Sequence, residues 1–259
     1  MVSDVVWRLV LDGAQRGSWN MAVDEVLMES VRLRGAPTLR LYAWDPPTLS
    51  FGRNQPARGL YPRDELQAAG VDIVRRQTGG RAVLHDQELT YSVAAPDRLL
   101  GSAKSAYRAI NEVFVGALRA LGVGASVHPT SEFTPPLSTA PCFAEPAAGE
   151  VVAGGRKLVG SAQVQRDGVL LQHGSVQLRR SPLFDLFSSD LTALLDGGAS
   201  YLIPLAGREL ATGEIVGAIE ECWRSAVGEV RAGSLTEEEE ERARERSRLY
   251  RHETWTWRR

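Results

Sequence analysis

The amino-acid sequence predicts a globular protein that contains both strands and helices, and two observations lead to this prediction. Short β-branched and apolar runs, bounded by Gly and Pro, recur between residues 5 and 178, whereas the chain after residue 211 has apolar residues at helical spacing. The 259 residues, 43% hydrophobic and 24% charged, suit one large or two small domains whose core needs no disulfide or metal.

The first part of the chain is expected to form strands separated by turn residues and two helices. The helix over residues 20–33 has apolar side chains near helical spacing, with Ser18 as its N-cap. A short helix over 62–69 ends at a glycine. The pair Gly79-Gly80 forms a turn between two strands. The expected strands cover residues 5–12, 38–42, 48–51, 72–75, 81–84 and 89–95.

The second part begins with the clearest helix, over residues 102–121, where apolar side chains recur at spacings of three and four and a glycine follows. Five prolines between residues 129 and 146 predict a long loop, and loops of that length are usually functional or disordered. Further strands are expected over 151–152, 157–164 and 169–178. Helices are expected over 212–227 and 236–251, the second of them opened by a capping box of Thr236 and Glu239.

Charge and hydropathy exclude several classes of protein. With 30 basic and 32 acidic side chains the net charge is −2, which argues against nucleic acid as a partner. No apolar run approaches the ~20 residues that a membrane span needs, and the N-terminus lacks the pattern of a signal peptide. Cys142 and Cys222 fit neither a metal site nor a disulfide framework. We therefore expect a cytoplasmic protein without a metal site and without contact to a membrane.

A segment with two glycines among arginines, RRQTGGRAVLHD at residues 75–86, is the first candidate site. Glycines allow close approach to the backbone, and Arg76 and Arg81 offer paired donors to a carboxylate or phosphate. The spacing matches neither a P-loop nor a dinucleotide fingerprint. An anion-binding loop and an ordinary hairpin turn with surface arginines both remain open from the residues alone.

Two further segments carry groups that could react. Cys142 lies in the proline-rich loop, where it is either a packing thiol or a nucleophile activated by a nearby cation. Lys157 begins an apolar strand, where burial would depress its pKa, although a surface lysine is equally compatible with the pattern. His173 on the following strand is either catalytic or a hydrogen-bonded structural residue. Cys222 lies in an apolar helical stripe and is expected to be a core thiol.

Several segments in one order resemble the lipoate–protein ligase and octanoyltransferase superfamily, which shares its fold with biotin protein ligase. They are NMAVDE at 20–25, PTLSFGRNQ at 47–55, RRQTGGRAVLHD at 75–86, GRKLVGSAQ at 155–163 and QHGS at 172–175. The resemblance implies an α+β fold in which a central mixed β-sheet is flanked by helices, and it places these helices on one side of the sheet. It also implies a single catalytic domain over 1–259, with its core at about 34–230 and the helix over 236–251 packed on it. The Pro-Cys-Phe stretch around Cys142 is most similar to the cysteine-dependent octanoyltransferases of Gram-positive type, although the run at 146–150 is less polar than in that group.

This resemblance implies that Cys142 accepts octanoate from acyl carrier protein as a thioester and passes it to a lysine of the glycine-cleavage H protein or a lipoyl domain, in lipoate biosynthesis. Lys157 would stabilise the thiolate and move a proton, and no cofactor is required. The expected substrate-binding residues are Arg76, Thr78, Gly79, Gly80, Arg81, His85, Gly160, Ser161, Ala162, His173 and Gly174.

Three alternatives stay open at this point. An ATP-dependent lipoate–protein ligase, or the catalytic subunit of one, would use ATP and magnesium. Arg76 and Arg81 would then hold the carboxylate and phosphate, Lys157 would hold the adenylate, and Cys142 would take no part. An amidotransferase would move lipoyl groups between carrier proteins through a cysteine. A non-catalytic ligand-binding or regulatory protein would transfer nothing.

Overall fold

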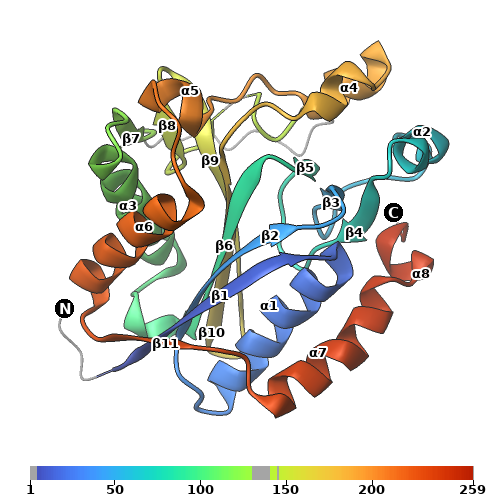
Figure 1. The fold of residues 1–259 in the computed structure, drawn as a ribbon. Helices are drawn as coiled ribbons and strands as arrows, with labels where there is room; N and C mark the ends of the chain where they lie inside the picture. The colour runs from blue at the N-terminus through green and yellow to red at the C-terminus, as the bar shows by residue number, and fades with distance from the viewer. Residues whose placement is uncertain (1–4, 130–140, 145, 259) are drawn as a thin grey trace.

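Two β-sheets organise the fold in a computed structural model that describes residues 5–129, 141–144 and 146–258. The larger sheet has the order β11-β1-β2-β6-β10-β9-β8-β7 and mixes parallel and antiparallel pairs (Figure 1). Its strands are β1 (Trp7–Gln15), β2 (Thr38–Trp44), β6 (Glu88–Pro96), β7 (Ala125–Val127), β8 (Val151–Ala153), β9 (Arg156–Arg166), β10 (Val169–Gln177) and β11 (Val230–Gly233). The smaller sheet has the order β4-β3-β5, with β3 (Thr48–Phe51), β4 (Asp72–Arg75) and β5 (Val83–His85).

Helices cover both faces of the larger sheet, so the expected arrangement with helices on one side is wrong. Along β2, Leu41 packs in the hydrophobic cluster that includes α3 and α6, whereas its neighbour Tyr42 packs in the cluster that includes α1 and α7. Successive side chains of a strand point to opposite faces, and β2 is buried on both, with Leu39 and Leu41 on one face and Arg40 and Tyr42 on the other. The helices are α1 (Gly17–Arg32), α2 (Arg63–Ala68), α3 (Ala103–Ala120), α4 (Ser189–Leu195), α5 (Leu202–Ala206), α6 (Thr212–Val227), α7 (Glu237–Tyr250) and α8 (Glu253–Thr256).

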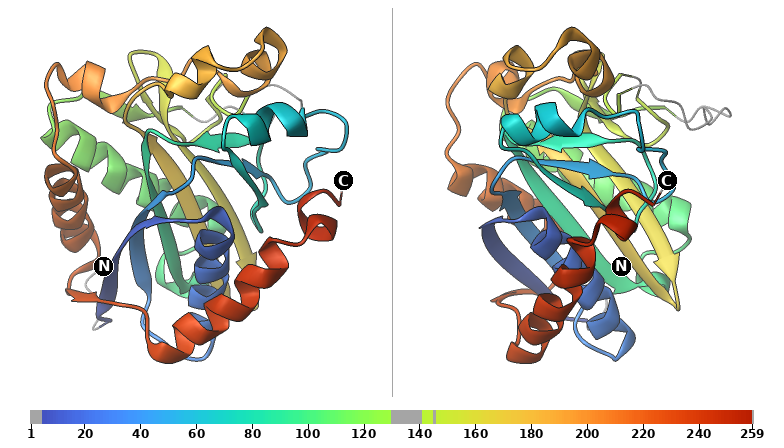
Figure 2. Two further views of the ribbon diagram at one scale, coloured as in Figure 1. Left: turned by 45° about the vertical axis from the view of Figure 1, so that its right-hand side comes forward. Right: turned by 90° about the vertical axis from the view of Figure 1, so that its right-hand side faces the viewer.

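The end of the chain connects the two sheets. After α6 it crosses the edge of the larger sheet as β11, runs along α1 as α7 and folds back onto the smaller sheet as α8 (Figure 2). The indole of Trp255 donates to the Arg75 carbonyl at the end of β4 (2.8 Å), and Arg75 Nε donates to the Thr256 carbonyl (2.9 Å). These reciprocal bonds attach α8 to the strand that precedes the glycine loop.

Most expected elements are present, with their ends shifted by a few residues. The capping box of α7 is confirmed, because Thr236 Oγ1 accepts from the Glu239 N–H (3.2 Å) and Glu239 Oε2 accepts from the Thr236 N–H (2.9 Å). The N-cap predicted at Ser18 is wrong: α1 begins at Gly17, and Ser18 is buried in its first turn. Seven elements of the described chain were not foreseen, since short segments carry too little periodicity. They are β7, β11, α4, α5, α8 and the 3-10 helices over Asp97–Leu99 and Pro182–Asp185.

The Gly79-Gly80 pair does not form a hairpin between neighbouring strands, as the sequence suggested. β4 and β5 both pair with β3, which lies between them, so residues 76–82 cross over the end of β3. Of the predicted loop over 129–146, residues 130–140 and 145 lie outside the described residues.

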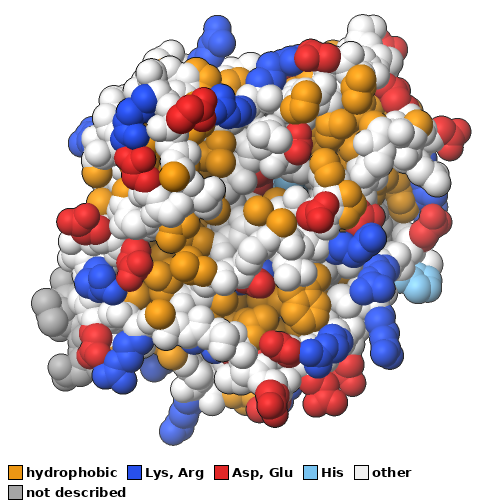
Figure 3. All heavy atoms as spheres, in the orientation of Figure 1, with side chains coloured by type: hydrophobic (Ala, Val, Ile, Leu, Met, Phe, Trp, Pro, Cys, Tyr) orange, Lys and Arg blue, Asp and Glu red, His pale blue; other side chains and the backbone are white. Residues whose placement is uncertain are grey.

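The surface and helix lengths add two observations. Basic and acidic side chains are interspersed over the face seen in Figure 3, where neither sign forms a continuous patch. Within the described part of the chain, no helix is both long and apolar enough to cross a membrane.

Candidate active site

A cavity of about 570 Å³ lies between the two sheets, and nearly all residues singled out from the sequence line it. This volume is typical of a small-molecule site. The predicted residues at its wall are Arg76, Gly80, Arg81, His85, Cys142, Lys157, Gly160, Ser161, Ala162, His173 and Gly174. Thr78 and Gly79 are not among the lining residues: Thr78 is buried and contacts His173, whereas Gly79 is exposed and its carbonyl accepts from Arg76.

Cys142 and Lys157, fifteen positions apart in sequence, meet at one end of this cavity. Lys157 Nζ lies 3.5 Å from Cys142 Sγ and 2.9 Å from the Cys142 carbonyl oxygen. The third neighbour of the amine is Glu150, whose Oε1 lies 2.6 Å away. The three N–H groups of the ammonium therefore have three acceptors, and only 2% of Lys157 is exposed. The amine is held against the sulfur in a single orientation.

The pKa of Lys157 is shifted in the opposite direction to the one expected. Burial by itself lowers this pKa, but the negative charges of Cys142 and Glu150, with their hydrogen bonds, outweigh burial and raise the pKa above the ordinary lysine value. The expectation of a depressed pKa is wrong because it considered burial without the carboxylate. Lys157 is an ammonium at neutral pH.

Glu150 was not identified from the sequence, although a signal for it was present. Gly154-Gly155 is the turn of the β8–β9 hairpin, and the register of this hairpin pairs Lys157 with Val152. Glu150 stands two residues before Val152, a diagonal position from which a long side chain reaches the lysine. Opposite charges that flank a Gly-Gly turn in an apolar context were the available signal.

Strands β9 and β10 form the wall beside the reactive pair. Gly160 of β9 lies so close to the lysine that a Cβ atom built on it would stand 2.9 Å from Lys157 Cε and 3.0 Å from Phe143 Cζ. Opposite Ser161, Gly174 of β10 leaves no room for a Cβ atom, which would stand 2.5 Å from a ring carbon of Tyr91. Both glycines are required by close approach rather than by backbone flexibility.

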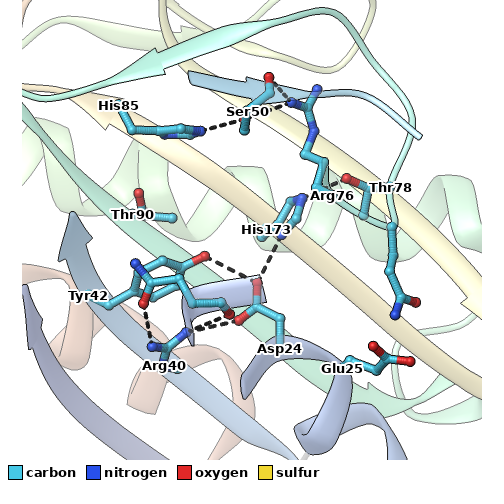
Figure 4. Close-up of polar contacts among 12 residues, drawn as sticks. Asp24, Glu25, Arg40, Tyr42, Ser50, Arg76, Thr78, His85, Thr90 and His173 are labelled. Carbon is cyan, nitrogen blue, oxygen red and sulfur yellow. Dashed lines mark hydrogen bonds and ion pairs between the residues drawn. The ribbon is translucent and has the colours of Figure 1, made fainter. Parts of the chain in front are cut away.

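The glycine loop is shaped by Arg76, whose guanidinium lies under it (Figure 4). Its Nη1 donates to the Ser50 carbonyl (3.0 Å) and Oγ (2.8 Å), its Nη2 to the carbonyls of Gly79 (3.0 Å) and Arg81 (2.6 Å), and its Nε to Gly79 (3.3 Å). All five N–H groups thus have acceptors within the chain. Gly80 has a φ of +93°, which only glycine adopts readily. This geometry makes Arg76 a support of the loop and disfavours a role as anion ligand.

Two buried histidines connect the same loop region to carboxylates (Figure 4). His173 Nε2 contacts Thr78 Oγ1 (2.6 Å) and its Nδ1 contacts Asp24 Oδ2 (3.0 Å). Burial lowers the pKa of His173, so the ring is neutral, donating through Nδ1 to Asp24 and accepting through Nε2 from Thr78. Burial acts to raise the pKa of Asp24, yet the hydrogen bond from His173 and the charge of Arg40 keep that pKa below its ordinary value. The arrangement is that of a structural, hydrogen-bonded histidine.

His85 forms a similar set of hydrogen bonds. His85 Nε2 contacts Ser50 Oγ (2.7 Å) and its Nδ1 contacts Glu88 Oε1 (2.6 Å). Burial acts to raise the pKa of Glu88, but the charge and hydrogen bond of His85 keep it below the ordinary value. The ring also stacks on Trp44, with centroids 4.0 Å apart. Ser50 in turn accepts from Arg76, so both histidines stabilise the region around the glycine loop.

The other cysteine, Cys222, is not among the residues that line the cavity. Cys222 is half-buried on α6, where it packs beside the hydrophobic core and 3.3 Å from a Cβ atom built on Gly116, and burial raises the pKa of its thiol. Among residues 5–129, 141–144 and 146–258, no group of three or more His, Cys, Asp or Glu side chains is placed to hold a metal ion.

Comparison with known families decides the relationship. Residues 16–195 match the model of the family described as the lipoyl protein ligase A/B catalytic domain. The chain belongs to this family. The resemblance recognised in the sequence is thereby confirmed.

Relatives of this family member include curated enzymes of the same length. It is 42% identical to octanoyltransferase LipM of Kyrpidia tusciae, over 97% of this chain and 98% of the relative. It is 32% identical to octanoyltransferase LipM of Staphylococcus epidermidis, over 98% and 99% of the two chains.

Solved structures agree on the fold. Protein Ta0514 of T. acidophilum with bound lipoic acid has a TM-score of 0.81 and 26% identity, covering 98% of this chain and 100% of that one. A lipoate-protein ligase A bound with ATP has a TM-score of 0.80 and 25% identity, covering 98% and 99%. The α+β fold with a central mixed sheet flanked by helices is confirmed.

Proposed function

We propose that this member of the lipoyl protein ligase A/B family is an octanoyltransferase that moves octanoate from acyl carrier protein to a lysine of the glycine-cleavage H protein or a lipoyl domain, in lipoate biosynthesis. The observation that carries the proposal is the 3.5 Å contact between Cys142 Sγ and Lys157 Nζ at the wall of the cavity. Its similarity along nearly the full chain to octanoyltransferases LipM supports the same activity. The cytoplasmic location expected from the sequence is part of this proposal.

The first half-reaction transfers the acyl group to the enzyme. The Cys142 thiolate attacks the carbonyl carbon of the donor thioester, the bond to the donor sulfur breaks, and the carrier leaves as a thiolate that takes a proton from solvent. The Lys157 ammonium stabilises the Cys142 thiolate because its charge lies in direct contact with the sulfur. In the second half-reaction the neutral amine of the acceptor lysine attacks the new thioester and forms an amide. The C–S bond breaks, Cys142 leaves as a thiolate, and the released amine proton passes to solvent.

The cavity provides a binding site for the octanoyl chain. Apolar side chains of Met21, Trp44 and Val83 line it together with most of the predicted substrate-binding residues. Burying roughly six methylenes at about 0.8 kcal/mol each supplies about 5 kcal/mol of binding before ordering costs. We assign Gly80, Gly160, Ala162 and Gly174 to the acyl channel because small residues there leave room for the chain.

A comparison of donors tests the proposal against the ligase. A thioester is already activated, so transfer from octanoyl carrier protein should proceed without ATP and magnesium, whereas a ligase needs both to use free lipoate. Strict dependence on ATP with free lipoate, and no transfer from the thioester, would overturn the proposal.

Two cysteine variants test the covalent step. Cys142→Ala should lose both transfer and the octanoyl adduct seen by intact mass, while Cys222→Ala, a matched change at the half-buried thiol of α6, should keep both. Full transfer by Cys142→Ala would exclude the acyl-enzyme.

A further inference from the structure

The active site contains a lysine that resembles the acceptor in chemistry. In the proposed function, on which this inference rests, a lysine amine of another protein attacks the octanoyl thioester on Cys142. Lys157 is also a lysine amine, and its Nζ lies 3.5 Å from the same sulfur. A group held this close to a reactive carbonyl has a large advantage over one that arrives from solution. The enzyme therefore needs a reason not to acylate itself.

We propose that Glu150 prevents self-acylation by holding Lys157 in its ammonium form after Cys142 has become an uncharged thioester. An ammonium has no lone pair and cannot attack a carbonyl carbon, so the octanoyl group stays on the sulfur until the acceptor lysine enters. Glu150 is a positioning residue in this role, because it acts through Lys157.

The charges around Lys157 before and after acylation support this role. Burial lowers the pKa of Lys157, whereas its contacts with Cys142 and with the Glu150 carboxylate raise it. Acylation converts the thiol into an uncharged thioester and so removes the contribution of Cys142. The pKa of Tyr107, which also lies near Glu150 and Cys142, is raised well above its ordinary value by burial and by Glu150, so the phenol is neutral. Arg81, whose Nη1 donates to the Pro141 carbonyl (3.4 Å), adds positive charge on this side.

In the acyl-enzyme, Glu150 is therefore the negative charge in contact with the amine among the described residues, at 2.6 Å. A buried amine without a counter-ion favours its neutral form, since burial penalises the charged form. With only 2% of Lys157 exposed, water cannot replace the carboxylate. Loss of Glu150 should thus generate a neutral amine beside the thioester.

Glu150 is itself fixed in place. Its Oε2 accepts from the Ala147 N–H (2.7 Å), its own N–H donates to the Ala147 carbonyl (3.1 Å), and its carbonyl accepts from the His128 N–H (2.7 Å). Only 5% of the residue is exposed. The carboxylate is thereby directed at the amine by the start of the β8–β9 hairpin.

The side reaction that Glu150 suppresses is balanced without another reactant. The neutral Lys157 amine attacks the thioester carbonyl carbon, the C–S bond breaks, and one amine proton moves to the leaving sulfur. The products are an octanoyl amide on Lys157 and a free Cys142 thiol. Because an amide is far less reactive than a thioester, each such event inactivates one enzyme molecule.

The experiment compares wild type with Glu150→Gln after incubation with octanoyl carrier protein and no acceptor. Glutamine keeps an oxygen for the Ala147 N–H but has no charge. In wild type, peptide mass analysis should place octanoate on Cys142, and hydroxylamine should release all of it. In Glu150→Gln, octanoate should accumulate on Lys157 in a hydroxylamine-resistant form, at least roughly tenfold faster than in wild type, the change produced by lowering the amine pKa by one unit.

Three further proteins complete the design. Glu150→Asp keeps the charge on a side chain that is shorter by one methylene, and octanoate should accumulate on Lys157 at a rate between those of wild type and Glu150→Gln. This variant also tests the inference if Glu150→Gln does not fold. Glu150→Gln with Lys157→Arg should give no resistant adduct. Glu214→Gln, the same change at an exposed residue paired with Arg208, should behave like wild type.

Two results would overturn the inference, and they are distinguishable. If octanoate stays on Cys142 and remains fully hydroxylamine-labile in both Glu150 variants for as long as in wild type, Glu150 has no protective role although the acyl-enzyme stands. If wild type transfers octanoate without any adduct on Cys142, the covalent step of the proposed function fails, and this inference fails with it.

Discussion

Replacing Lys157 by methionine isolates the contribution of the buried ion pair to stability. Methionine has a similar length and an adaptable shape, so it fills the space of the lysine stem with little loss of packing. The substitution removes the cation 2.6 Å from Glu150 Oε1 and the donor 2.9 Å from the Cys142 carbonyl. Both partners remain buried or half-buried, and the carboxylate keeps only the Ala147 N–H.

The expected cost follows from this geometry. Removing one partner of a buried ion pair typically destabilises a protein by about 3–5 kcal/mol, because the other charge is left uncompensated. In a chain of this size each kcal/mol lowers the melting temperature by about 2–4 °C. Lys157→Met should therefore lower it by roughly 6–20 °C.

Urea unfolding followed by far-ultraviolet circular dichroism measures this cost, and a double-mutant cycle identifies its source. Glu150→Gln combined with Lys157→Met removes both charges of the ion pair, so the double variant should recover at least half of the stability lost in Lys157→Met. A loss below about 1 kcal/mol in Lys157→Met, the value of an exposed ion pair, would refute the assignment of a buried pair. A double variant as unstable as the sum of the single variants would refute the coupling.

Three other predictions concern the walls of the site. Gly160→Ala should push Lys157 away from the sulfur and lower octanoyl transfer by about 10²-fold in a steady-state assay, whereas Gly124→Ala, at a glycine with open space around it, should not. Arg76→Lys leaves buried carbonyls of the glycine loop without donors and should cost about 1–3 kcal/mol in urea unfolding; unchanged stability would contradict a supporting role. The lowered pKa of His173 means that the unfolded chain binds more protons below pH 6.5, so wild-type stability should fall as the pH drops from 6.5 toward the folded-state value. In His173→Gln the urea midpoint should fall less steeply over that range, and an equal slope would exclude the histidine.

The sequence predicted well those features that depend on neighbours along the chain. The helix over 102–121 follows from its own apolar spacing, and α3 covers Ala103–Ala120. The capping box of Thr236 and Glu239 links residues three positions apart and is present as predicted. The N-cap predicted at Ser18 is wrong, because a serine before an apolar run is compatible with several helix starts. In the folded protein α1 begins at Gly17.

The sequence motifs identified most residues that line the cavity, but they did not identify the long-range contacts that hold these residues in place. Asp24 lies within the first family motif, yet its hydrogen bond to His173 joins α1 to β10 across 149 positions. The glycine in PTLSFGRNQ is explained by a similar long-range contact, since a Cβ atom on Gly52 would stand 1.9 Å from the Gly80 carbonyl oxygen. Such requirements cannot be read from one segment alone.

By itself, the sequence determined the class of fold and the family and singled out Cys142 and Lys157 as candidates, because motifs and periodicity are properties of contiguous residues. Only the tertiary structure decided that helices cover both faces of the larger sheet, since the residues of β2 do not reveal which helix packs on each face. It also decided the direction of the pKa shift of Lys157: burial alone predicts a depressed pKa, whereas contacts with Cys142 and with the carboxylate of Glu150 raise it. The sign of that shift depends on the distances from the amine to these two side chains, and those distances exist only in the folded protein.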